Sequence, residues 1–84
     1  MATQIVKCIC DNSNWMSSLE SATLKITSPT GKHIWLRKSR MIGLNEDDRN
    51  LVWKCVGDEM IRNTKFVVDL TRDEMISLLR ISKL

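Results

Sequence analysis

The stretch ATLKITSPTGKHIWLR, residues 22–37, carries the clearest fold signal in the sequence. Apolar and polar residues alternate on both sides of the turn formers SPTG, residues 28–31. Proline presets φ for the second position of a turn, and glycine tolerates a positive φ near its end. The pattern therefore predicts a β-hairpin. Because the alternation repeats every second residue, four side chains should point toward the core: Leu24, Ile26, Ile34 and Leu36.

Other segments with short apolar or alternating patterns are typical of strands. They are residues 3–10, 41–44 (a short strand or edge segment), 51–56 and 60–70. Turn formers fill residues 11–20, where the spacing of Trp15, Met16 and Leu19 predicts one or two helical turns. Residues 45–50 (NEDDRN) are expected to form a polar loop, and Gly57 to begin a turn.

The C-terminal segment has strong helix-start signals. Thr71 and Glu74 fit a capping box, in which each side chain accepts a hydrogen bond from the other residue's backbone N–H. The helix should pack on the sheet through a broad apolar face: Met75, Ile76, Leu78 and Leu79. Ile81 and Leu84 are expected to point away from that face, either as an exposed terminus or as a self-association or partner contact.

These elements predict an α+β fold made of a single domain over residues 1–84. We expect an antiparallel β-meander of about five strands, forming a curled sheet or a partly open small barrel, with one C-terminal helix packed on it.

Residues 24–79 resemble, in pattern, the small FlbD-type flagellar accessory proteins. The matching pieces are GKHIWL at residues 31–36, Met41 and Leu44, KFVV at residues 65–68, and Glu74 with Met75. The chain departs from that pattern by an additional N-terminal strand and a longer final hairpin. The resemblance implies a similar topology, and no function is carried over from it, because a fold does not imply a function.

Composition narrows the classes of protein. The 84 residues are 43% apolar and 27% charged, as in a soluble globular domain, and the net charge of +3 favours anionic partners only weakly. The N-terminus lacks the pattern of a signal peptide, and no apolar run is long enough to span a membrane. Three cysteines, an odd number, fit a reducing compartment. We therefore expect a cytoplasmic protein, in the host cytosol if it is viral.

Catalytic and metal sites have little support. Cys8, Cys10 and Cys55 with His33 form the single metal-like set, but zinc needs three or four converging ligands, so no metal or other cofactor is expected. The sequence has no phosphate-binding glycine loop or nucleophile motif, and residues 46–48 (EDD) are interpreted as a solvated loop. We expect no enzymatic activity.

The basic stretch at residues 28–40 is the best candidate for a site. On an alternating strand, His33, Trp35 and Arg37 share the outer face, with Lys25 opposite. Such a face could bind phosphates and stack a base, form a protein interface, or remain a polar surface on which arginines cover the tryptophan. The predicted partner-binding residues are Lys25, Lys32, His33, Trp35, Arg37, Lys38, Arg40 and Trp53.

A second indole from Trp53 on the same face would make that face too apolar to be left in water, which favours a protein partner. The leading hypothesis is a small binding protein that works by protein–protein interaction, as a phage-type inhibitor or adaptor acting on a host (defence) protein. The alternatives are a nucleic-acid-binding module that uses the basic hairpin face, and a homo-oligomer such as a homodimer. No membrane partner is expected.

Overall fold

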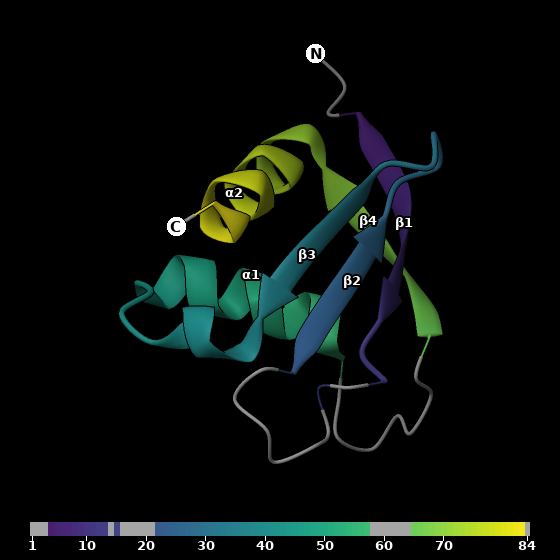
Figure 1. Ribbon diagram of the computed structural model, residues 1–84. Helices are drawn as coiled ribbons and strands as arrows, with labels where there is room; N and C mark the ends of the chain where they lie inside the picture. The colour runs from purple at the N-terminus through teal and green to yellow at the C-terminus, as the bar shows by residue number, and fades with distance from the viewer. Residues whose placement is uncertain (1–3, 14, 16–21, 58–64, 84) are drawn as a thin grey trace.

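The computed structural model describes residues 4–13, 15, 22–57 and 65–83. In this part of the chain, antiparallel strands form one open four-stranded sheet, and two helices lie on one side of it (Figure 1). The strands are β1 (Ile5–Asp11), β2 (Thr23–Thr27), β3 (His33–Arg37) and β4 (Lys65–Thr71). The helices are α1 (Glu46–Val56) and α2 (Arg72–Ser82), and a 3-10 helix, η1 (Lys38–Met41), follows β3.

The strand order is β3-β2-β1-β4, so the last strand returns to lie beside the first. This is the spatial order of a Greek key rather than of a simple meander. The α+β class and the antiparallel sheet are confirmed, but five strands and a single helix are not. β1 and β4 pair along seven residues, from Ile5 with Thr71 to Asp11 with Lys65.

The hairpin at residues 22–37 is confirmed in its details. Leu24 pairs with Leu36 and Ile26 with Ile34, and all of these side chains are buried. Gly31 has φ 87° in the turn, a value that favours glycine. The hairpin therefore supplies one half of the inner sheet face, as its period of two predicts.

The expected loop at residues 45–50 and strand at residues 51–56 are both wrong, because residues 46–56 form helix α1. The Asn45 side chain accepts a hydrogen bond from the backbone N–H of Asp48 at 2.8 Å and so caps the helix. The acidic side chains of the first turn suit the helix dipole. Val52, Cys55 and Val56 are buried together at helical spacing.

Residues 41–44 do not form the expected strand either. Met41 ends η1, Gly43 follows with φ 85°, and Leu44 is buried before the cap of α1. The final strand is confirmed over residues 65–70 and extends to Thr71, whereas residues 60–64 and the turn expected at Asp58 and Glu59 lie outside the described residues. The helical turns expected within residues 11–20 lie mostly outside them as well, although Trp15 is described and buried.

The C-terminal helix begins at the predicted capping box. The Thr71 hydroxyl accepts from the Glu74 N–H at 3.1 Å, and the Glu74 carboxylate accepts from the Thr71 N–H at 2.9 Å. Ile81 does not point away from the core as expected: it is fully buried. It lies three residues after Leu78, about 60° away around the helix, and Leu78 is the residue that faces the sheet. Of the apolar face expected to pack on the sheet, Leu78 is buried and Met75 packs against the core, but Ile76 and Leu79 are exposed.

Both helices cover the same face of the sheet. The even-numbered residues of β1, from Val6 to Cys10, point into a core shared with α1 and α2. Cys8 approaches the Met75 sulfur at 3.5 Å, and the buried Asn12 donates to the Val56 carbonyl at the end of α1. The opposite face, made of the odd-numbered residues, has no helix over it in the described part of the chain.

Candidate binding face on the open side of the sheet

The uncovered side of the sheet, here called the open face, gathers the outward side chains of all four strands. The paired registers align them in rows that cross the sheet. One row is Lys65, Asp11, Lys25 and Trp35, and the next is Val67, Ile9, Thr27 and His33. Trp35 is 54% exposed, and Ile9 and Val67 are also exposed. The sequence analysis included neither Ile9 nor Val67 in the candidate site.

Trp35 is held in place by its cross-strand and same-strand neighbours. Lys25 lies directly opposite on β2, and its Nζ sits 5.2 Å from the centroid of the indole ring. The His33 ring is tilted by 56° against the indole, with the ring centroids 6.4 Å apart. The Thr27 hydroxyl and the His33 Nδ1 are 3.0 Å apart and share a hydrogen bond. The predicted cluster of Lys25, His33 and Trp35 is therefore brought together.

The open face has two halves of different charge. On the β1–β4 half, acids and bases pair: Lys7 Nζ lies 3.3 Å from Asp69, and Lys65 Nζ lies 4.0 Å from Asp11. Hydrogen bonds from Ser13, opposed by slight burial and aided by Lys65 and Lys25, hold the pKa of Asp11 below its usual range. On the β2–β3 half, the ion pairs of the described residues include neither Arg37 nor Arg40. That half is therefore the positive one.

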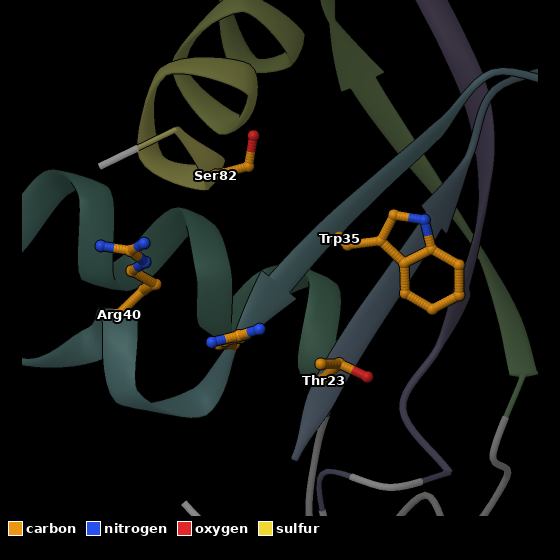
Figure 2. Close-up of a pocket in the computed structure, with 5 residues that line it drawn as sticks. Thr23, Trp35, Arg40 and Ser82 are labelled. Atoms are coloured by element: carbon orange, nitrogen blue, oxygen red, sulfur yellow. The ribbon is translucent and has the colours of Figure 1, made fainter. Parts of the chain in front are cut away.

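A hollow of about 430 Å³ lies where β3 meets η1 and the end of α2. Its lining residues are Thr23, Trp35, Arg37, Arg40 and Ser82. Figure 2 shows that Trp35 and Thr23 come from neighbouring strands, Arg40 from η1 and Ser82 from the last turn of α2. Arg40 thus lines the same hollow as Trp35 and Arg37, as an exposed cation.

A second hollow, of about 470 Å³, lies at the other end of β3. It is bounded by the hairpin turn on one side and by α2 on the other. Its lining residues are Ser28, Thr30, Lys32, His33, Ile34, Met75 and Leu79. Lys32 therefore lies at this hollow, while Leu79 offers an exposed apolar side chain on the opposite wall.

The other predicted contact residues lie elsewhere. Lys38 is half-buried in η1, where its Nζ donates to the Trp15 carbonyl at 3.2 Å. Trp53 is exposed on α1, so it does not share the face of Trp35 as the strand interpretation required. Ile81 has no exposed surface to offer a partner, and Leu84 lies outside the described residues.

The three cysteines form a buried group beneath the sheet. All of them are free thiols with no exposed surface. A hydrogen bond to Cys10, and then burial, raise the pKa of the Cys55 thiol, while burial and the nearby Cys10 raise the pKa of Cys8. Within the described residues, no three His, Cys, Asp or Glu side chains gather closely enough to hold a metal ion. All three cysteines belong to the hydrophobic core.

No known protein family matches this chain, and neither a curated protein nor a solved structure is significantly similar to it. The resemblance to FlbD-type proteins stays a prediction. Among the described helices, none has the length and apolar character needed to cross a membrane.

Proposed function

We propose that this chain is a small non-enzymatic binding protein whose open face contacts a partner protein. The observation that carries the proposal is where the exposed apolar side chains lie. Ile5, Ile9, Trp35 and Val67 are each about half exposed or more, and all four lie on the sheet face that no described helix covers. Ile9 and Val67 are neighbours on this face, the Lys7–Asp69 row separates them from Ile5, and Thr27 and Lys25 lie between them and Trp35. An exposed face that mixes tryptophan, aliphatic and charged side chains in this way suits a protein interface.

The chemistry of the face favours a protein over a nucleic acid. Ile9 and Val67 lie side by side next to the row that contains Trp35, and aliphatic side chains do not stack bases as indoles do. Asp11 and Asp69 place negative charge on the same face. Tryptophan and arginine are the residue types that contribute most at protein interfaces, which suits Trp35 and Arg37.

Within this proposal, the function is that of a phage-type inhibitor or adaptor that occludes a host (defence) protein. A chain with one binding face and a small core has little room for an enclosed substrate cavity, so its effect would come from covering or bridging a surface. The basic half of the face would select a partner surface that carries acids.

Differential capture from a lysate of the native host tests the proposal. The chain and its Trp35→Ala variant are immobilised in parallel, with Trp53→Ala as the matched control because Trp53 is similarly exposed but lies on α1. We expect a stoichiometric protein partner whose affinity falls at least about 30-fold with Trp35→Ala, as for an interface hot spot. Trp53→Ala should retain binding. Equal binding by both variants, or recovery of nucleic acid alone, would contradict the proposal.

Nucleic-acid binding is the second candidate, favoured by the cations around Trp35. Lys25 lies over the indole, and Arg37 and Arg40 line the adjoining hollow. These groups could contact phosphates while the indole stacks a base for about 1–3 kcal/mol. A gel-shift assay at low salt with single- and double-stranded probes decides this candidate. Nucleic-acid binding requires that the chain shift the mobility of a probe, that added salt abolish this shift, and that Trp35→Ala weaken it.

A further inference from the structure

Hydrogen-bonded and non-bonded residue pairs alternate along the hairpin, and this alternation decides which backbone groups of β3 have no partner on β2. Ser28 N–H donates to the Lys32 carbonyl, and Lys38 N–H donates to the Ala22 carbonyl. In an antiparallel ladder the hydrogen-bonded pairs alternate with non-bonded ones, so Leu24–Leu36 and Ile26–Ile34 are also bonded pairs. The N–H and C=O groups of the intervening residues therefore point away from β2: His33, Trp35 and Arg37.

These free groups line an edge that nothing in the described chain occupies. β3 is the terminal strand of the sheet, and no backbone hydrogen bond from a described loop or helix reaches its three outward residues. The close contacts of Lys25 with Trp35 and of Thr27 with His33 agree with this alternation, because side chains approach most closely at non-bonded pairs. The edge therefore presents a row of unused donors and acceptors.

The edge has a hollow at each of its two ends. Each hollow is lined by residues of β3 and of α2, and Figure 2 shows the one that Trp35 and Ser82 line. A strand placed beside β3 would have α2 on one side, with Met75 and Leu79 at one end and Ser82 at the other. Its other side would continue the open face next to Trp35.

The charges along this edge favour an acidic binding partner. Lys32, His33, Arg37 and Arg40 lie along or at the ends of β3 and are all exposed. The ion pairs of the described chain use none of these residues. An incoming strand with carboxylates on its open-face side would meet Arg37, and Arg40 lines the hollow at the same end of β3. Its alternate side chains would face Leu79 and should be apolar.

We propose that β3 receives an extended acidic segment of a partner protein, which adds to the sheet as a further strand. This inference rests on the proposed protein-binding function and names its mode: main-chain hydrogen bonds to His33, Trp35 and Arg37, with alternating acidic and apolar side chains. A second copy of this chain is disfavoured as the occupant, because edge-to-edge pairing would bring two sets of basic residues together. A nucleic acid cannot supply the strand hydrogen bonds.

Peptides selected for binding provide the probe. A display library of random linear peptides is selected against the immobilised full chain, and the tightest binder is resynthesised with a single N-methyl group at each backbone amide in turn. In an added strand, alternate amides point toward β3, so methylation should weaken binding about tenfold at every second position and little between them. The selected sequences should be enriched in acidic residues that alternate with apolar ones.

Variants of the chain and hydrogen exchange complete the test. Arg37→Glu should weaken the selected peptide at least about tenfold, whereas Lys65→Glu makes the same charge change on the opposite edge strand and should have little effect. The amides of His33, Trp35 and Arg37 should exchange freely in the unbound chain and become protected in the complex.

The outcomes separate this inference from the proposed function. Peptide binding that lacks the period-two methylation pattern, or hydrogen-exchange protection confined to other strands, would contradict strand addition at β3. The proposed protein-binding face would still stand. Failure to select any peptide also overturns strand addition. Host-partner capture that depends on Trp35 stands independently of both results.

Discussion

At the scale of single residues, Asp48 and Arg80 make the most consequential polar contact between the helices. Arg80 Nη2 donates to both carboxylate oxygens of Asp48, at 3.0 and 2.9 Å. Asp48 is largely buried in the first turn of α1, whereas Arg80 comes from the last turn of α2 and is half exposed. A carboxylate held this far from water needs its partner, because an unpaired buried charge is costly.

Arg80→Ala should therefore destabilise the fold by about 2 kcal/mol, less than the cost of breaking a fully buried pair because Arg80 is partly solvated. Urea denaturation of Arg80→Ala, Asp48→Asn and the double variant measures the coupling, which we expect to be about 1 kcal/mol or more. The control is Arg72→Ala, an exposed arginine at the other end of α2 that should change stability by less than about 0.5 kcal/mol. Additive effects would show that the pair contributes no coupling.

At the scale of elements, the two helices differ in how far the sequence predicts them. The start of α2 follows from Thr71 and Glu74, whose side chains reach only local backbone groups. The α1 segment contains an equally local cap at Asn45, but residues 51–56 read as a strand because a short apolar run suits either element. The buried spacing of Val52, Cys55 and Val56, continued from the acidic first turn, was the signal that favoured a helix.

The capping box of α2 should make stability depend on pH in acid. Partial burial of Glu74 acts to raise its pKa, but the Thr71 N–H and Lys54, 3.2 Å away, outweigh burial and hold the pKa of Glu74 below its usual range. A carboxylate with a lowered folded-state pKa stabilises the fold above its unfolded pKa of about 4.3, and this stabilisation is lost as the pH falls through the folded-state pKa.

Glu74→Gln should therefore reduce the free energy of unfolding by about 1 kcal/mol at neutral pH and by less in acid, so its stability curve is flatter below about pH 5. Urea denaturation at several pH values measures this difference. Asp73→Asn removes an exposed acid from the same helical turn and should leave the acid dependence close to that of the parent chain. A loss that is the same at every pH would assign the effect of Glu74 to its hydrogen bond rather than to its charge.

At the scale of the whole molecule, only part of the candidate site could be predicted from the sequence. The alternation around residues 33–37 was enough to gather His33, Trp35 and Arg37, because a strand fixes which side chains share a face. The neighbours Ile9 and Val67 depend on β4 returning beside β1, a long-range pairing that no local pattern encodes. Trp53 was expected on this face because residues 51–56 were interpreted as a strand. These residues belong to helix α1, so Trp53 lies on a helix and not on the sheet.

The charge distribution of the whole molecule predicts opposite responses to salt for self-association and for partner binding. The net charge is +3, and Lys32, Arg37 and Arg40 lie along the free edge of β3. Two copies meeting at this edge would repel, so sedimentation at about 50 mM salt should show a monomer, and any dimer should appear only at high salt, where screening is stronger. An acidic partner segment should instead bind more weakly as salt rises, since screening removes the attraction. A dimer that forms at low salt and dissociates at high salt would place complementary charges at a self-interface and make a second copy the occupant of the edge.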